Sequence, residues 1–441
     1  MSGKDYASTH KAFIIVATSM LLLLLTHSAY AGGGYFALGY GPLSRQMAGA
    51  TTAVAGDAFA GASNPAKLSA LNNRLDAGVE LFNPHRKVER TGSGTPFDFS
   101  ADSKNSLYVI PELAYAHRIN DQLSLGISMY ANGGLNSEYV ENTGIPNTNA
   151  NPAQCGTAPG NFFLGCGKAG FDLAQIILAP TAAWKVTTKH SIGIAPLFAL
   201  QRFSAFGLNA FAPTSLYPGN VTDRGNDYAL GAGVRIGWFG EMNEWLNLGA
   251  AYSSKIYMRD LDQYKGLFAE GSFDIPANAS IGLALKPSAT WLIAMDIQHI
   301  YFSEVKALGN SLLNSLTNPI TNPLGSATGS GFGWQRNQTT YKLGLAYSPT
   351  QQLTLRGGFA YGKRPNDNDI NAVSFSVLTP NPLRQASLGF TWKVDEKNEF
   401  HMAASRFIKA TYAGPSALFP GATESVTPYV NTLSAAWSWH L

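Results

Sequence analysis

The sequence has few charged residues and few cysteines for its length. Asp, Glu, Lys and Arg together make up 13% of the 441 residues, and cysteine occurs only at positions 155 and 166. The formal net charge of +3 is too small to indicate a nucleic-acid partner. After residue 31, no stretch approaches the ~18 consecutive apolar residues of a membrane-spanning helix. The rest of the chain therefore offers no candidate for a transmembrane helix.

The N-terminus has the pattern of a secretory signal peptide. Lys4 and Lys11 supply positive charge, an apolar run follows from residue 12 to residue 25, and Ala29-Tyr30-Ala31 is a small-x-small cleavage site. The run is short for a membrane span, which disfavours the alternative of an uncleaved anchor. We therefore predict a signal peptide over residues 1–31 and export of the chain.

The C-terminus alternates apolar and polar residues, as a strand does when its two faces meet different surroundings. The apolar face carries Tyr429, Leu433, Ala435, Trp437, Trp439 and Leu441, and the polar face carries Thr432, Ser434, Ser438 and His440. Asn431 is the polar exception on the apolar face. The closing strand of an outer-membrane barrel has this pattern, because one face meets lipid and the other meets the lumen.

Fourteen segments of the chain are strand candidates. They lie near residues 75–90, 107–119, 121–133, 171–187, 189–204, 226–239, 243–257, 276–286, 289–303, 337–348, 351–363, 383–394, 397–411 and 428–441. Short polar turns and long loops alternate strictly between them, as in barrels with short periplasmic turns and long extracellular loops. A large soluble β-protein would not be expected to show this alternation. The sequence thus predicts an all-β fold, a 14-stranded antiparallel transmembrane β-barrel over residues 74–441 in the bacterial outer membrane.

The segment over residues 32–73 does not fit a strand pattern. It is rich in Gly and Ala, precedes the first strand and is too small for a core of its own. We expect it to lie inside the barrel as a hatch, or plug; a periplasmic tail is the alternative.

The two cysteines are close in sequence, in a segment rich in Gly, Pro and Asn. In an exported chain such a pair favours a disulfide, here between Cys155 and Cys166, that closes a surface loop. A metal site is less favoured because no His lies near them.

The sequence resembles the FadL family of outer-membrane transporters for long-chain fatty acids and hydrocarbons. The resemblance rests on five motifs and covers essentially the whole mature chain. The motifs are Ala55-Gly-Asp-Ala58, Ser63-Asn-Pro-Ala66, Asn132-Gly-Gly-Leu135, the segment 266–276 with the sequence Gly-Leu-Phe-Ala-Glu-Gly-Ser-Phe-Asp-Ile-Pro, and Gly331-Phe-Gly-Trp334.

The resemblance implies a barrel plugged by the hatch, with a lateral exit where the third strand is kinked. The hatch and gate residues would be Asn64, Pro65 and Ala66 of the Asn-Pro-Ala motif, together with Gly133 and Gly134 at the kink. In this reading Asn64 props the kink, because its amide can both donate and accept hydrogen bonds. From the residues alone, an ordinary Asn-Pro turn and an ordinary strand end remain alternatives.

Family members hold the fatty-acid carboxylate with basic residues in the lumen, and the resemblance implies Arg202 and Arg336 for this role. Strict alternation, however, places Arg202 on the apolar face unless a bulge intervenes. Alternation also points Arg235, Lys342 and Arg356 into the lumen, where ion pairs that steady the barrel are the simpler interpretation.

The function that the resemblance implies is passive uptake of hydrophobic compounds, most of all long-chain fatty acids, without a cofactor or a metal. Aromatic or aliphatic hydrocarbons are alternative substrates. A barrel enzyme such as a phospholipase is the alternative from another class, but the eight scattered His residues suggest no nucleophile–base arrangement. Expected partners are outer-membrane lipid, lipopolysaccharide and the barrel assembly machinery. The barrel is expected to be a monomer.

Overall fold

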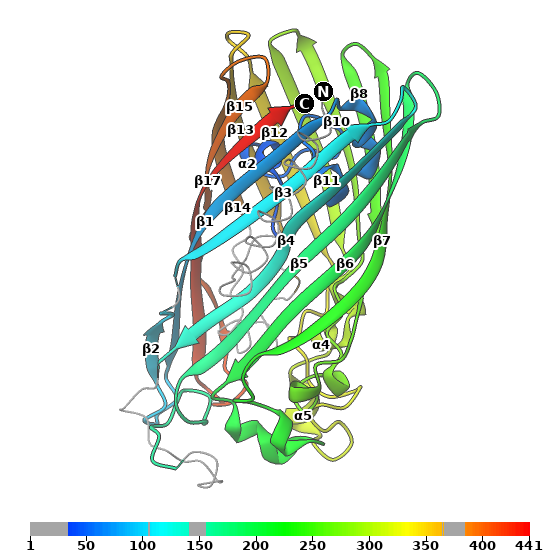
Figure 1. Cartoon of the computed structure of the whole chain (residues 1–441). Helices are drawn as coiled ribbons and strands as arrows, with labels where there is room; N and C mark the ends of the chain where they lie inside the picture. Colours follow the sequence, from blue (N-terminus) through cyan, green and yellow to red (C-terminus); the bar gives the residue numbers. More distant parts are fainter. Residues whose placement is uncertain (1–33, 105, 141–155, 364, 366–383) are drawn as a thin grey trace, which may run out of the picture.

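The computed structural model describes residues 34–104, 106–140, 156–363, 365 and 384–441. The predicted signal peptide and Cys155 lie outside the described residues. Within them, a single antiparallel sheet winds into the barrel of Figure 1. Fourteen strands form its wall: β1 (Arg74–Thr91), β3 (Tyr108–Arg118), β4 (Leu123–Tyr139), β5 (Ala169–Lys185), β6 (His190–Phe206), β7 (Asp227–Asn243), β8 (Leu246–Ser253), β10 (Asn278–Ser288), β11 (Trp291–Ile300), β12 (Gln338–Tyr347), β13 (Leu353–Gly362), β14 (Arg384–Lys393), β15 (Asn398–Phe407) and β17 (Thr423–His440).

The first and last strands close the barrel. β1 pairs with β17 along its whole length, from Arg74 opposite His440 to Thr91 opposite Thr423. Three short strands lengthen the wall at the end that carries the long loops, namely β2 (Phe99–Asp102), β9 (Tyr257–Met258) and β16 (Tyr412–Pro415). The predicted barrel, with its short turns at one end and long loops at the other, is confirmed.

The helices are short and lie in the N-terminal segment and the loops. They are α2 (Pro42–Gln46), η1 (Phe59–Ala62), η2 (Pro65–Ala70), η3 (Asn209–Thr214), η4 (Pro218–Asn220), η5 (Asp262–Tyr264), η6 (Ala269–Gly271), η7 (Phe302–Glu304), α4 (Lys306–Gly309) and α5 (Leu313–Thr317). Among the described residues, none of the helices has the length and apolar character needed to cross a membrane.

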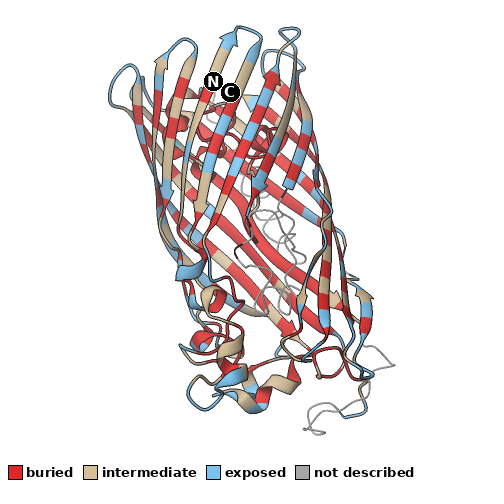
Figure 2. Ribbon diagram, turned by 180° about the vertical axis from the view of Figure 1, so that it is seen from behind, coloured by how far each residue is buried: buried red, intermediate tan, exposed pale blue. Residues whose placement is uncertain are grey.

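The two faces of the wall differ in chemistry, as the alternation predicts. Buried and exposed residues alternate along the strands in Figure 2. The outer face carries exposed apolar side chains, among them Leu81, Ile236, Leu343, Phe359 and Leu433. Exposed Trp residues gather at the short-turn end: Trp184, Trp245, Trp291, Trp392 and Trp439. An apolar belt with an aromatic girdle fits the lipid-facing surface of a membrane barrel.

The third strand of the wall, β4, differs from its prediction. The sequence predicted a strand that ends at residue 133, but β4 continues to Tyr139. A β-bulge between Ala131 and Gly133 inserts one extra residue, so the inward side chains change from even to odd positions. The alternation breaks at the bulge, which is why the sequence indicated a strand end there.

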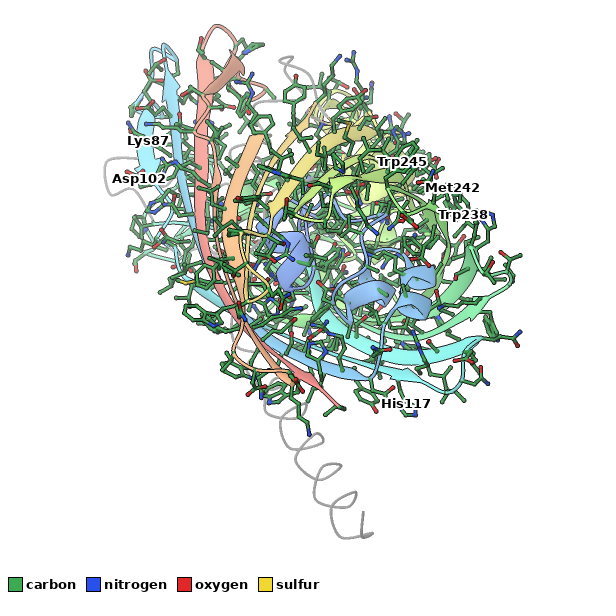
Figure 3. The ribbon with its side chains drawn as sticks, turned by 90° about the horizontal axis from the view of Figure 1, so that it is seen from above. Lys87, Asp102, His117, Trp238, Met242 and Trp245 are labelled. Atoms are coloured by element: carbon green, nitrogen blue, oxygen red, sulfur yellow. The ribbon has the colours of Figure 1, made fainter. Side chains whose placement is uncertain are left out.

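Residues 34–71, here called the N-terminal segment, lie within the ring of strands. Figure 3 looks down the barrel from the short-turn end and shows the helices of this segment inside the wall, while Trp238 and Trp245 lie at the rim. Most side chains of the segment are buried, including Phe59, Ala66 and Leu68. The wall supplies the core that a segment of this size lacks.

Candidate functional site

β3 and β4 separate from each other in the half of the wall near the long loops. Their ladder runs from Arg118 opposite Ser124 to Leu113 opposite Met129 and ends there. Beyond that point, β3 continues to Tyr108 along β1, and β4 continues to Tyr139 along β5. Over this stretch both strands are described but they do not pair with each other. We call it the β3–β4 split.

Among the described residues, hydrogen bonds cross the split at two places. Tyr108 on β3 donates its hydroxyl proton to the side-chain oxygen of Asn136 on β4. Nearer the loops, the backbone amide of Lys104 donates to Glu138 O at 2.8 Å. A break in a ladder leaves backbone groups that need other partners, because lipid supplies none.

The N-terminal segment supplies such partners to β4 at the bulge. Phe36 and Gly133 form an antiparallel bridge. Ala37 N donates to Asn132 O at 3.0 Å, and Gly134 N donates to Tyr35 O at 3.0 Å. A Cβ on Gly133 would lie 1.9 Å from Tyr35 O, so this approach requires glycine.

The same segment also binds β3, through Glu112 at the edge of the split. Glu112 is 2% exposed and accepts hydrogen bonds from Gly41 N at 3.1 Å and from the Arg45 guanidinium at 2.9 Å. Arg45 also forms an ion pair with Glu80 of β1. The N-terminal segment therefore bridges the two strands that separate from each other.

A row of buried amides lines the inner wall behind the bulge. Asn132 Nδ2 donates to Gln175 Oε1 at 2.9 Å, and Gln175 Nε2 donates to Gln201 Oε1 at 2.7 Å. Gln201 continues the row to the carbonyl of Phe273 at 3.3 Å. The alternation that places Arg202 on the apolar face also places its neighbour Gln201 inside. The row itself was not predictable, because it depends on the register of β4, β5 and β6.

The Asn-Pro-Ala motif lies against β6 and β7 and not at the bulge. Asn64 Nδ2 donates to Trp238 O of β7 at 2.8 Å and to Thr52 O at 3.0 Å, and Asn64 Oδ1 accepts from Ala66 N at 3.2 Å. These contacts cap η2. These hydrogen bonds fix the N-terminal segment to β7, three strands along the wall from β4. None of them reaches the kinked strand, so the role of Asn64 as its prop stays a prediction.

Two glycines make room for the motif. Gly193 and Gly237 are directly opposite each other on β6 and β7. A Cβ on Gly237 would lie 2.1 Å from Asn64 Oδ1, and one on Gly193 would lie 2.5 Å from Ala66 N. The wall is shaped to receive this part of the segment.

The inward basic residues of the strands donate hydrogen bonds to the N-terminal segment. Arg235 donates to Gly61 O at 2.7 Å, and Lys342 donates to Leu38 O at 3.0 Å. Arg356 donates to the Gln46 side chain at 2.8 Å. Their predicted inward direction is confirmed, but the expectation of ion pairs is replaced by hydrogen bonds to the segment.

Neither Arg202 nor Arg336, the residues predicted to bind a carboxylate, lies on the inner wall of the lumen. Arg202 is opposite Ala174 on the outer side of the ladder and pairs with Asp172 at 2.7 Å, so its charge is already compensated. The strict alternation was right, and no bulge turns Arg202 inward. Arg336 is exposed in the loop before β12. The structure does not bring these two residues together at one site.

Apolar side chains of the long loops surround a narrow cavity of about 40 Å³. Its lining includes Phe163, Leu208, Phe211, Phe268, Leu316 and Leu418. The volume is far below the ~300–1,000 Å³ of typical ligand pockets. The loops must therefore part before the cavity admits a ligand.

A chain of aromatic rings leads from this cavity to the bulge. Phe268 contacts Phe332 with ring centroids 5.4 Å apart, and Phe332 lies 6.2 Å from Trp334. Trp334 lies 6.1 Å from Tyr35, the residue whose carbonyl binds β4. Phe302 contacts both Trp334 and Phe36. Buried rings thus connect the loops to the β3–β4 split without a charged side chain among them.

Two ionisable side chains of the N-terminal segment have strongly shifted pKa values. Burial, reinforced by the nearby carboxylate of Asp76, raises the pKa of Asp57 to about 6. Burial lowers the pKa of Lys67 to about 8, although Asp57 and Asp296 oppose the shift. Both groups hold the segment together: Asp57 accepts from Leu43 N at 3.1 Å.

One nucleophile–base contact occurs on the inner wall, between Ser438 and His401. Ser438 Oγ lies 2.8 Å from His401 Nε2, and His401 Nδ1 lies 2.9 Å from Thr391 Oγ1. A hydrolytic triad would need a carboxylate in the place of Thr391 and an accessible serine, but Ser438 is 0% exposed. The contact acts as a structural network between β14, β15 and β17.

Cys166 is 8% exposed and is not a free thiol. Because Cys155 lies outside the described residues, the disulfide between them stays a prediction. No group of three or more His, Cys, Asp or Glu that could hold a metal occurs among the described residues.

The fold and the site define a class of protein, an outer-membrane β-barrel whose lumen holds its own N-terminal segment. The sequence matches the family described as outer membrane protein transport protein (OMPP1/FadL/TodX) over residues 22–153 and 165–413. The chain therefore belongs to this family of outer-membrane transport proteins.

Solved structures show the same fold. The Pseudomonas putida toluene transporter TodX is 18% identical, with a TM-score of 0.66 over 92% of this chain and 100% of its own. The Ralstonia pickettii toluene transporter TbuX is 17% identical, with a TM-score of 0.62 over 92% of this chain and 99% of its own. A Pseudomonas aeruginosa FadL homologue is 16% identical, with a TM-score of 0.65 over the same shares. A search of curated protein sequences found no match.

Proposed function

We propose that this protein carries hydrophobic compounds across the outer membrane by passive diffusion, without enzymatic chemistry. The observation that carries the proposal is the continuous path of apolar and aromatic side chains from the loop cavity to the β3–β4 split. The free energy of an apolar solute falls along this path, because each buried contact removes apolar surface from water. The inner wall beyond the path is polar and holds the N-terminal segment.

In this mechanism the compound enters where the loops part and moves along the rings to Tyr35 and Phe36. It then leaves sideways through the β3–β4 split into the membrane. The N-terminal segment acts as the hatch: it closes the lumen to polar solutes and must release its bonds to Asn132 and Gly134 for the exit to open. Long-chain fatty acids are the proposed substrates.

A second route has an observation of its own. A cavity of about 600 Å³ lies at the short-turn end, between the N-terminal segment, the turn from β7 to β8, and β10, β11, β12 and β13. Its lining combines Trp245 and Trp291 with Lys286 and Arg356. A compound that passed the hatch would reach the periplasm there, without entering the membrane.

The substrate class is tested by the compounds that copurify with the protein and by uptake. Mass spectrometry of protein extracted from cells should find fatty acids or apolar hydrocarbons. Cells that carry the protein should take up labelled oleate faster than cells with an empty vector, at equal growth and permeability to polar dyes. Equal uptake in the two strains would contradict the proposal.

A further inference from the structure

Arg86 of β1 is a buried cation on the inner wall beside the β3–β4 split. Its side chain belongs to the inward row of β1, and the residue is 4% exposed. Its neighbour Lys87 lies on the outer surface, where Figure 3 shows it next to Asp102. The Arg86 guanidinium lies near the hydroxyls of Tyr108 and Tyr139.

The charge of Arg86 is not compensated within the described part of the chain. No ion pair joins it to a described carboxylate, and its Nη1 has no hydrogen-bond partner there. The acidic groups near Tyr108 have other partners: Glu138 pairs with Lys168 at 3.1 Å, and Asp172 pairs with Arg202 at 2.7 Å.

Other inward cations differ from Arg86 in this respect. Arg74 pairs with Asp76, Arg90 pairs with Glu424, and Arg45 pairs with Glu80 and Glu112. Lys67, Lys342 and Arg235 bind backbone carbonyls of the N-terminal segment. The fold therefore provides partners for these cations but leaves Arg86 with an unused donor.

A buried, unpaired guanidinium is costly, because arginine does not lose its proton in proteins and desolvation disfavours the charge. Its planar donors match a carboxylate, which can accept two hydrogen bonds at once. The natural complement of Arg86 is therefore an anion with flat, paired oxygens.

Apolar side chains lie next to this cation. A buried cluster contains Leu38, Phe82, Tyr108, Ile110, Ala131, Phe407 and Val430. Tyr108 belongs to this cluster and also contacts Arg86 and, across the split, Asn136. One site thus offers a cation for a head group and an apolar surface for a chain, at the strands that the proposed exit involves.

We propose that Arg86, oriented by the neighbouring Tyr108 and Tyr139, binds the carboxylate of a long-chain fatty acid on the inner side of the β3–β4 split. This assignment rests on the proposed function and narrows its substrate class to amphipathic carboxylates. Arg86 is the specificity residue, in place of Arg202 and Arg336. An uncharged hydrocarbon would leave the Nη1 donor of Arg86 without a partner.

The test compares oleate with oleyl alcohol, which has the same chain and a neutral head group. Binding of each to the purified full-length protein in detergent is measured by displacement of a fluorescent fatty acid. The wild type should bind oleate more tightly than the alcohol. Arg86→Gln should weaken oleate binding about tenfold or more, the effect of losing hydrogen bonds to a charged group. Its binding of the alcohol should change less than about twofold.

Arg336→Gln is the matched control, since it removes an exposed arginine, and it should leave both affinities unchanged. Heat-dependent mobility in gels verifies that each variant retains its barrel. If Arg86→Gln does not fold, Tyr108→Phe and Arg86→Lys take its place, and each should weaken oleate selectively.

Unchanged oleate binding in folded Arg86→Gln, or equal losses for both compounds, would overturn the assignment. Equal wild-type affinities for the two compounds would overturn it too, but would leave transport of hydrophobic compounds standing. Failure of the wild type to bind or transport either compound would instead contradict the proposed function itself.

Discussion

At the scale of single residues, small side chains decide where the N-terminal segment lies. Gly193 and Gly237 admit the Asn-Pro-Ala motif, and Gly133 admits Tyr35. Any Cβ at these positions would meet backbone or a fixed side chain, so the segment fits this wall in one arrangement. The polar contacts then hold that arrangement in a surrounding where unpaired groups are costly.

Gly237→Ala should loosen the N-terminal segment without unfolding the barrel. Its Cβ would lie 2.1 Å from Asn64 Oδ1 and 2.8 Å from Pro65 Cδ, an overpacking that costs about 1–3 kcal/mol. Limited proteolysis should cut the segment at residues 60–71 faster than in the wild type. Gly357→Ala is the control within a strand, because its closest contact is the flexible Leu388 side chain at 3.2 Å. Equal cleavage of both variants would contradict the role of Gly237.

The docking of the N-terminal segment should depend on pH through Asp57. Docking raises the pKa of Asp57 to about 6, from the ~4 of a solvated aspartate. A raised carboxyl pKa means that protonation favours the docked state, so docking strengthens as the pH falls from about 6 toward about 4 and does not depend on this group well above pH 6.

Hydrogen exchange of the segment, corrected for the intrinsic rate, should therefore slow about tenfold or more between pH 7.5 and pH 5. Asp57→Asn, which does not titrate, should remove most of this dependence. If Asp57→Asn kept the full pH dependence of exchange, another titrating group would be responsible for it.

At the scale of elements, β4 shows what the sequence could and could not predict. Alternation identified the strand, and its glycines indicated an irregularity. The bulge itself was not predictable, because it reverses the inward positions and makes Tyr139 an inward residue instead of a loop residue. The pairing of Tyr35–Ala37 with β4 joins residues about a hundred positions apart, and alternation carries no signal for such a contact.

Gly133→Ala should detach the N-terminal segment from β4. The new Cβ would lie 1.9 Å from Tyr35 O, so the hydrogen bonds of Ala37 N and Gly134 N should be lost. Each is worth about 0.5–1.5 kcal/mol, and the exchange of these two amides should accelerate about tenfold. Gly357→Ala is the control, because its Cβ would first meet the flexible Leu388 side chain at 3.2 Å. No acceleration in folded Gly133→Ala would show that the segment binds β4 by other contacts.

At the scale of the whole molecule, the sequence predicted the barrel well. Fourteen alternating segments, strictly alternating connections and an apolar C-terminal strand all follow from one physical requirement, a wall with lipid outside and a polar interior. The candidate site was less predictable. Arg202 and Arg336 were candidates because of the resemblance to the family. Arg86, Tyr108 and Asn136 could not be predicted, because they are brought together only by the register of strands that separate from each other.

Removal of residues 34–71 should convert the protein into an open pore. The segment contacts several strands of the wall from inside, while β1 and β17 close the wall without it. The shortened chain should still form a barrel. In planar bilayers it should conduct ions far better than the wild type, which should conduct little. Equal conductance of the shortened chain and the wild type would contradict the role of the segment as a hatch.

The central claim is that apolar cargo leaves through the β3–β4 split, and a reversible lock across the split tests it most directly. Tyr108 and Asn136 touch across the split through the end of the tyrosine ring, so Tyr108→Cys and Asn136→Cys are combined and joined by a bis-maleimide reagent whose spacer contains a disulfide. The two single variants control for loss of either side chain and for the native cysteines. We predict that cross-linking abolishes oleyl alcohol uptake, that binding persists, and that reduction of the spacer restores uptake. Undiminished uptake by fully cross-linked protein would contradict the account and direct the exit to the cavity at the short-turn end.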